Sequence, residues 1–474
     1  MTTAPLTNLD FLRDCARMEV HRSVETDAFH VPDWFCQATN PHARLLIGAP
    51  GSGKSWFAAM QIRQGLSRAM AIPGISSDAS GILRFPGADR LRPDAVRLRW
   101  ALSFCREVMA DEFREDAART AEAAWEEVRR VLSLLNERSR TFTPPPYLYD
   151  NLHLIESNDK GFQNLAITSL VMLWAEWCKS YPHLNVKILL TPAMTSVIDR
   201  FDRTLFSKAN ERVHLSWSDR DLCLALLCHL SALGPRMRAY LSTLGVTFPM
   251  FPGLPEIGEG PVAHEAVLRH LVCHERKDGA RKAPAPKWLL HRLRDAHGRI
   301  PVDALPLFVK HTARRTIDAM PADEMDSLAK APPSPIAILP GSRAFVDAGK
   351  SIFNRVATHA PLVACATLFG GCGFPMAQAE MTDLILSTTG DGGADETHVP
   401  VLLRSYTPTL LRSFVSGDPF VVSQESTTEP IVQALVEHGI LGVVADKGGY
   451  QAHLPDLYLR AVGAFRRGGV PRAC

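Results

Sequence analysis

The stretch that most constrains the fold of this chain is RLLIGAPGSGKSWF, which spans residues 44–57. Within it, Gly48, Gly53, Lys54 and Ser55 satisfy the pattern G-x-x-x-x-G-K-[ST], in which a buried strand ends in a glycine-rich loop and a helix follows. The glycines let the backbone turn successive N–H groups around an anion, and the positive end of the helix dipole points at the same anion. The sequence therefore predicts a strand over 45–47, a phosphate-binding loop, and a helix from Lys54.

The residue types in this loop indicate a nucleotide with its magnesium ion. We expect Lys54 to reach the β- and γ-phosphates and the Ser55 hydroxyl to ligate Mg²⁺. The alternative is a structural glycine turn. We therefore predict ATP and Mg²⁺ as cofactors, and we predict that the nucleotide-binding residues are Gly48, Ala49, Pro50, Gly51, Ser52, Gly53, Lys54, Ser55 and Trp56.

A second buried strand is predicted in YLYDNLHLIE, residues 147–156, and it ends at Asp150. This acid is the candidate for holding the water shell of the metal, and the alternative is an aspartate that caps a turn. Efficient ATPases commonly place a second acid nearby, but Asn151 and His153 occupy these positions and Glu156 is the first following carboxylate. Because Asn151 can orient a water but cannot take its proton, we expect slow hydrolysis.

A third strand, NVKILLTPAM at 185–194, places Thr191 where a polar γ-phosphate sensor would lie, although a threonine that simply ends a strand before a proline is equally consistent. Arg200, Arg203 and Arg212 follow, each a candidate arginine finger for a neighbouring subunit or an ordinary surface arginine. The predicted catalytic residues are therefore Lys54, Asp150, Asn151 and Thr191, and the predicted metal ligands are Ser55 and Asp150.

The order of strands and helices predicts an α/β chain with a parallel P-loop NTPase sheet, a mostly helical stretch up to residue 320, and a mainly helical C-terminal domain. In that last domain a helix through 432–438 and the strands LGVVA and YQAHL around the turn DKGG indicate a winged helix. The predicted divisions are 1–42 as an N-terminal extension, 43–217 as the ATPase core, 218–320 as a helical segment, 321–343 as a proline-rich linker and 344–474 as the winged-helix-like domain.

The composition limits the kinds of partner and the cellular compartment that we expect for this chain. The chain has 474 residues, 46% of them apolar, and a net charge of only +2, so no overall basic field indicates nucleic acid. Its ten cysteines include no C-x-x-C pair, which favours free thiols in a reducing compartment. The N-terminal residues lack the pattern of a secretory signal, and the most apolar stretch, 360–377, is broken by glycines and a proline. We therefore expect a cytoplasmic protein without a membrane partner.

Taken together, several stretches resemble a bacterial branch of the AAA+/STAND-type P-loop ATPases, close to the KAP-like and defence-island ATPases. The stretches are GAPGSGKSWF, YLYDNLHLIE, FDRTLFSKANERVHLSWSDRDLCLALLCHL, the lid-like WLLHRLRDAHGRIPVDALPLFVKHTARR and the C-terminal LPDLYLRAVGAFRRGGVP. The resemblance implies an ATP-binding core, a helical lid and a winged-helix region that act as an oligomerising regulator in stress or phage response.

The chain departs from that family at three places. Asn151 and His153 stand where related sequences tend to have further acids after the first aspartate. No arginine lies near Thr191, and Arg299 precedes Pro301 where the lid of the family has proline before arginine. These departures weaken the expectation of catalytic turnover more than the expectation of nucleotide binding.

Two functional hypotheses follow. The first is an ATP-dependent switch that assembles as a homo-oligomer or exposes a surface to an effector protein. The second is a nucleic-acid remodeller or loader of origin-recognition type, which needs a basic recognition helix. Its candidate helix, STTEPIVQALVEHG, has two glutamates and no lysine or arginine, so nucleic acid is the less favoured partner. A small-molecule kinase would leave the large C-terminal half without a role.

Overall fold

The computed structural model of the chain forms two compact units. One unit comprises 34–215 with 404–431, and we call it the sheet unit; the other comprises 1–33, 216–403 and 432–474, and we call it the helical unit. The structure describes residues 5–20, 30–72, 92–114, 120–141, 144–152, 155, 160–208, 210–248, 255–258, 263–274, 285–338, 343–356, 369–377, 380–381, 384, 435–436, 439–446, 449–459 and 461–467.

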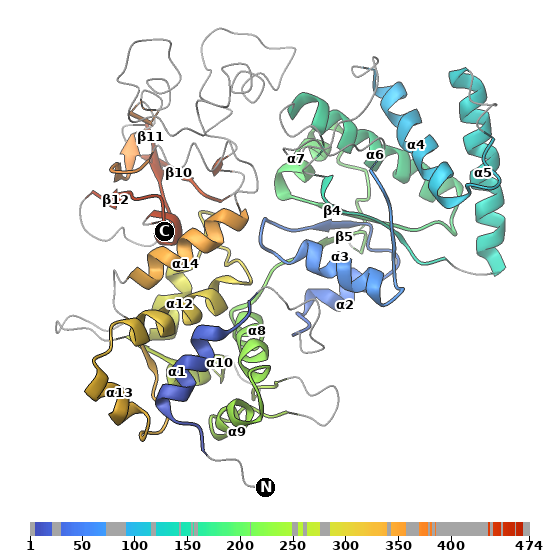
Figure 1. Cartoon of the computed structure of the whole chain (residues 1–474). Coiled ribbons are helices and arrows are strands. Elements are labelled where there is room, and N and C mark those ends of the chain that lie inside the picture. Colours follow the sequence, from blue (N-terminus) through green and yellow to red (C-terminus); the bar gives the residue numbers. More distant parts are fainter. Residues whose placement is uncertain are drawn as a thin grey trace. The chain divides into compact units, whose positions relative to one another are not determined.

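The sheet unit is built on a five-stranded parallel sheet with the order β2-β3-β4-β1-β5 (Figure 1). The strands are β1 (Leu45–Ile47), β2 (Arg68–Ala69), β3 (Tyr147–Tyr149), β4 (Val186–Leu190) and β5 (Arg212–His214). The helices are α2 (Trp34–Thr39), α3 (Lys54–Arg63), α4 (Pro93–Val108), α5 (Ala121–Thr141), α6 (Lys160–Ser180) and α7 (Pro192–Phe201). Because parallel strands need crossover connections, this order confirms the predicted α/β class and P-loop fold.

The two faces of the sheet are covered by different helices. Alternate residues of a strand point to opposite faces, and Val186, Ile188 and Leu190 of β4 share a buried cluster with α4, α5 and α6. Leu189 between them is also buried, on the face where α2 and α3 lie (Figure 1). Burial on both faces explains why these strands read as continuous apolar runs in the sequence.

Aromatic rings fill the core beneath β3. The Tyr147 ring lies edge-on to Phe104 of α4 at 4.8 Å between centroids, and the Tyr149 ring lies edge-on to Trp100 at 5.8 Å. Trp174 of α6 contacts both tyrosines. Burial raises the pKa of Tyr147 to about 12, so the hydroxyl stays neutral. These contacts anchor the strand that carries Asp150.

A buried lysine joins the sheet to the segment that follows α2. Lys187 of β4 has no exposed side-chain surface, and its Nζ donates hydrogen bonds to the backbone oxygens of Ala38, Asn40 and Ala43 at 2.5, 2.8 and 3.3 Å. The three N–H donors of the ammonium group therefore each have an acceptor. Burial lowers the pKa of Lys187 from 10.5 to about 8. The contact fixes the approach of the chain to β1.

The helical unit brings the N-terminal helix together with distant segments. Helix α1 (Asn8–Arg17) packs on α12 (Ala304–Asp318), which also packs on α14 (Arg343–Val356) and on α8 (Asp219–Ser231). The other helices are α9 (Pro235–Thr243), α10 (Ala263–Leu271), α11 (Ala285–Arg292), α13 (Ala322–Leu328) and α20 (Asp456–Leu459). The strands are β6 (Val272–His274), β7 (Ile336–Ile338), β8 (Gly373–Phe374), β9 (Met376–Ala377), β10 (Gly442–Asp446), β11 (Gly449–His453) and β12 (Phe465–Arg466).

The structure agrees with the predicted helical character of 218–320 and with the predicted hairpin, which is β10 paired antiparallel with β11. Of the helix expected over 432–438, only 435 and 436 lie within the described residues, where they are helical, and Gly439 ends it with a φ of 70°. The segment 321–343, expected as a linker, contains α13 and also β7, which pairs with β6. It belongs to the same compact unit as the segments on both of its sides.

Within the part of the chain that the structure describes, no helix combines the length and the apolar character that crossing a membrane requires.

We expect Lys187→Met to lower the free energy of unfolding by about 2 kcal/mol at neutral pH, because three carbonyl groups lose their donor. The pH dependence has a definite sign. Since the folded-state pKa lies below the unfolded value of 10.5, the unfolded chain binds more protons between pH 8 and 10.5. The wild type should therefore gain stability relative to the variant as pH rises through that window, by about 1 kcal/mol per pH unit at most.

Urea unfolding from pH 7 to pH 11 measures both effects. Lys179→Met is the matched control, because Lys179 is an exposed lysine on α6 of the same unit. A Lys187 variant that behaved like the Lys179 variant would show that the buried ammonium group does not hold the 38–43 segment.

Candidate functional site

The predicted phosphate-binding loop lies between β1 and α3. Gly51 and Gly53 have φ values of 75° and 87°, in the left-handed region that favours glycine. The Gly48 N–H donates to the Leu190 oxygen at 3.0 Å, which extends the β1–β4 ladder by one residue. A Cβ on Gly48 would lie 2.2 Å from the Ser52 hydroxyl oxygen, so this position has no room for a side chain. The loop therefore has the closely curved backbone that an anion nest requires.

Lys54 is the first residue of α3 and turns back over the loop. Its Nζ donates to the backbone oxygen of Gly48 at 2.6 Å and to that of Ala49 at 3.0 Å. The ammonium group is thus held inside the loop, where it can meet a phosphate group. Ser55 follows in the first turn of α3 and is exposed, so its hydroxyl is accessible to a metal ion.

Two other predicted residues lie at the same edge of the sheet as this loop. Asp150 follows β3 and Thr191 follows β4, and the carboxyl ends of parallel strands meet at one edge. In the register, Leu190 pairs with Ile47 and Ile188 pairs with Tyr149, so β4 lies between the loop and Asp150. Neighbouring strands are about 4.8 Å apart, which sets Asp150 about 10 Å across the sheet from the start of the loop.

Thr191 has a structural role that its sequence position already allowed. Its hydroxyl accepts a hydrogen bond from the Met194 N–H at 3.3 Å and caps α7, with Pro192 as the first helical residue. Residues 192–194, expected as the end of the third strand, are therefore the first turn of a helix. The assignment of Thr191 as a γ-phosphate sensor stays a prediction.

Asn151 adopts a backbone conformation that few residues tolerate. Its φ is 59° and its side chain is exposed, directly after Asp150. Asparagine enters the left-handed region more readily than most other residues with a side chain. Such conformations concentrate at functional sites, and the assignment of Asn151 as a catalytic residue stays a prediction. His153 and Glu156, the other candidates in this loop, lie outside the described residues.

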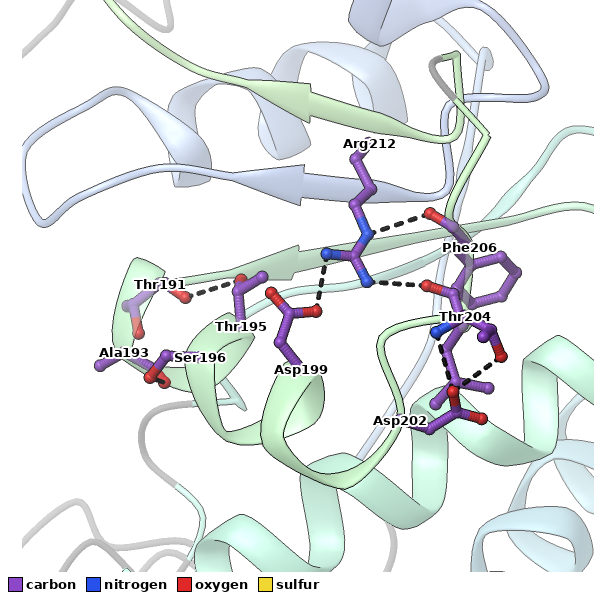
Figure 2. Close-up of polar contacts among 10 residues, drawn as sticks. Thr191, Ala193, Thr195, Ser196, Asp199, Asp202, Thr204, Phe206 and Arg212 are labelled. Carbon is purple, nitrogen blue, oxygen red and sulfur yellow. Dashed lines mark hydrogen bonds and ion pairs between the residues drawn. The ribbon is translucent and has the colours of Figure 1, made fainter.

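Arg212 is committed to the fold, which removes it from the candidate arginine fingers. Its guanidinium group donates to the Asp199 carboxylate at 2.7 Å and to the backbone oxygens of Leu205 and Phe206 at 2.8 and 3.0 Å (Figure 2). It thereby closes the loop between α7 and β5. Arg200 and Arg203 are exposed and stay candidates.

A second arginine braces the same loop from β1. The Arg44 guanidinium lies over the Phe206 ring, 5.4 Å from its centroid, and donates to the Glu211 carboxylate at 3.0 Å. Phe206 itself has a φ of 49°, an unusual value for a residue with a bulky side chain. Because Arg44 directly precedes β1 and Arg212 is the first residue of β5, this network lies at the amino ends of these strands, opposite to the P-loop.

The sequence interpretation missed an aromatic cluster behind the loop. The ring of Phe35 in α2 lies 6.3 Å from that of Trp56 and 5.5 Å from that of Phe57, and Trp34 lies 5.9 Å from Phe57. The sequence signal was present as WF at 34–35 and WF at 56–57, two aromatic pairs on either side of β1. They place α2 against the helix that presents Lys54 and Ser55.

Metal-binding clusters and disulfides do not contribute to this site. Among the residues that the structure describes, no group of three or more His, Cys, Asp or Glu side chains could hold a metal ion by itself, and the cysteines are free. A cation at the loop would therefore depend on the phosphate oxygens of a nucleotide as well as on Ser55 and Asp150.

Arg299, which we compared with the lid arginine of the family, lies in the helical unit. It donates a hydrogen bond through Nε to the Asp295 carboxylate at 3.1 Å.

Comparisons with known proteins leave the family open. No family model matches the chain, and no curated protein matches it. Among solved structures it is similar to a Walker-type ATPase of Pyrococcus abyssi, with 12% identity over 97% of this chain and 99% of that chain and a TM-score of 0.34. A score that low carries no argument about function, so the site rests on its own geometry.

We expect Arg212→Met to lower the free energy of unfolding of the sheet unit by about 3 kcal/mol, because an ion pair and two hydrogen bonds to backbone oxygens are lost together. Arg200→Met and Arg203→Met should stay within about 0.5 kcal/mol of the wild type, since both arginines are exposed. Chemical denaturation followed by tryptophan fluorescence measures the difference. Equal stability of the three variants would contradict the structural assignment of Arg212.

Proposed function

We propose that this chain is an ATP- and Mg²⁺-binding P-loop ATPase with slow turnover that acts as an oligomerising regulatory switch. The observation that carries the proposal is the loop between β1 and α3, where two left-handed glycines shape the backbone and Lys54 is held over it. Gly48 has no room for a side chain. A bare backbone at this position agrees with a loop that must approach phosphate oxygens closely.

The residues divide the work of binding. Backbone N–H groups of the loop and the N-terminal end of α3 would surround the phosphates, and Lys54 would exchange its two carbonyl contacts for phosphate oxygens. Ser55 and Asp150 are the residues that would hold Mg²⁺ and its water shell. When bound, MgATP supplies the transferable γ-phosphoryl group. Thr191 directly follows β4, the strand between the loop and Asp150, and its side chain would hydrogen-bond near that group.

Slow hydrolysis follows from the residue beside Asp150. Asn151 can orient a water molecule through its amide but has no group that accepts the proton of that water. A switch needs no rapid turnover, because a ligand shifts an equilibrium by its difference in affinity for the two states. A role in bacterial stress or phage response, with a second copy or an effector protein as partner, belongs to the same proposal and is supported by the family resemblance of the sequence.

We expect Lys54→Ala to abolish ATP binding and every nucleotide-dependent change of assembly, because the loop loses its only ammonium group near the phosphates. Fluorescent ATP titration measures binding, and mass photometry with and without MgATP measures assembly. Lys179→Ala, an exposed lysine of the same unit, is the control and should match the wild type.

Assembly that is identical with and without MgATP in the wild type would overturn the switch. Tight DNA binding at physiological salt with stimulated hydrolysis would instead favour the nucleic-acid remodeller.

We expect Asn151→Asp and Asn151→Glu to accelerate single-turnover ATP cleavage by at least about tenfold, because a carboxylate beside Asp150 can take the proton of the attacking water. Asn151→Gly is the control: it keeps the left-handed backbone and supplies no carboxylate. Fast cleavage by the wild type, or no difference between the acidic variants and the glycine variant, would contradict the proposed cause of slow turnover.

A further inference from the structure

Two connections between the units leave the sheet unit from positions that contact the P-loop region. The first connection is the peptide bond between residues 215 and 216, directly after β5. The Leu215 N–H donates to the Ile47 oxygen at 2.8 Å, and a Cβ on Gly48 would lie 3.2 Å from the Leu215 Cβ. The last residue before this connection therefore packs on the first glycine of the loop.

The second connection is the peptide bond between residues 33 and 34, directly before α2. Trp34 is buried against Phe57, and Phe35 contacts Trp56 and Phe57. Both partners lie in the first turns of α3, two and three residues after Lys54. A change in the position of the loop or of α3 on binding phosphate would thus act on both connections at their first residues.

In the helical unit, the Asp221 carboxylate hydrogen-bonds to the segment that leads to each of these two connections. His30 Nε2, four residues before Trp34, lies 2.6 Å from Asp221 Oδ1. The other oxygen, Oδ2, accepts hydrogen bonds from the Ser218 hydroxyl at 2.6 Å and from the Ser218 N–H at 3.1 Å. Ser218 is the N-cap of α8 and stands three residues after Leu215.

The Asp221 carboxylate is buried and is stabilised in its charged form. It is 4% exposed, and although burial alone would raise its pKa, the hydrogen bonds from His30 and Ser218 lower the pKa below its usual value. The charged form is therefore the one that the site stabilises. Helix α8 beyond it is buried along most of its length and packs on α9, α10 and α12, so a displacement of its N-terminus is transmitted into the unit's core.

We propose that the His30–Asp221 hydrogen bond is a latch that ties both P-loop connections to the N-terminus of α8 and couples nucleotide occupancy to the helical unit. This coupling rests on the proposed ATP binding. The capping box of α8 needs only Ser218 and Asp221, so the contact to His30 adds a function that helix capping does not explain.

Two variants separate the latch from the cap, because each removes one of the partners of the same carboxylate. His30→Ala removes the latch and keeps the cap, whereas Ser218→Ala removes the cap bond and keeps the latch. Hydrogen exchange read by mass spectrometry in peptides 30–38 and 219–226, with and without MgATP, measures both. His30→Gln retains a side-chain donor and should restore the wild-type pattern, which separates the latch from a general folding defect.

Without nucleotide, we expect His30→Ala to exchange about tenfold faster than the wild type in peptide 30–38 and to stay within about threefold of the wild type in peptide 219–226. We expect Ser218→Ala to exchange about tenfold faster in peptide 219–226 and to stay within about threefold in peptide 30–38. With MgATP, the wild type and Ser218→Ala should gain protection in 219–226, and His30→Ala should lose that gain. Equal patterns for the two variants, or retained nucleotide-linked protection in His30→Ala, would overturn the latch.

Fluorescent ATP binding is measured on the same samples and separates the two proposals. If the wild type binds ATP and the 219–226 peptide does not respond, the latch is wrong and the ATPase function stands. If the wild type does not bind ATP, the proposed function fails and the nucleotide coupling fails with it.

Discussion

The pairing of β1 with a parallel strand on each side is the constraint on which the rest of the site depends. Leu45, Leu46 and Ile47 are hydrogen-bonded within the sheet between β4 and β5, and the ladder continues to the Gly48 N–H. A slip of one residue in a strand that is paired on both sides would disrupt both ladders and exchange the faces to which its side chains point. The loop therefore starts at one place, level with the ends of β3 and β4.

Two cationic side chains of this unit bind backbone oxygens of its irregular segments. Lys187 satisfies the carbonyl group of Ala38 in α2 and two more after that helix. Arg212 satisfies two in the loop before β5 together with the Asp199 carboxylate. Irregular segments carry carbonyl groups that no ladder pairs, and leaving such groups buried without a donor is costly. The two charged side chains thus allow short, tightly packed connections into the amino ends of β1 and β5.

The proposed switch and the proposed latch share one physical requirement. Phosphate binding must change the position of the loop or of α3, and the contacts of Leu215 and Trp34 with this region then carry the change to the two connections. The energy for it is the difference in nucleotide affinity between the two states and not the energy of hydrolysis. A slow catalytic centre with Asn151 beside Asp150 is compatible with that mode of action, since the bound state then lasts.

The sequence by itself determined the phosphate loop, the strand before it, the helix from Lys54 and the parallel α/β class, because local backbone demands and buried-strand composition are written in consecutive residues. It also placed Asp150 and Thr191 at strand ends, and the structure confirms these positions. Only the tertiary structure decided that Arg212 closes a loop, that Lys187 is buried, and that His30 meets Asp221 across 191 positions of sequence. Those outcomes depend on which distant backbone oxygens and carboxylates folding brings within hydrogen-bond distance, and no local pattern encodes that distance.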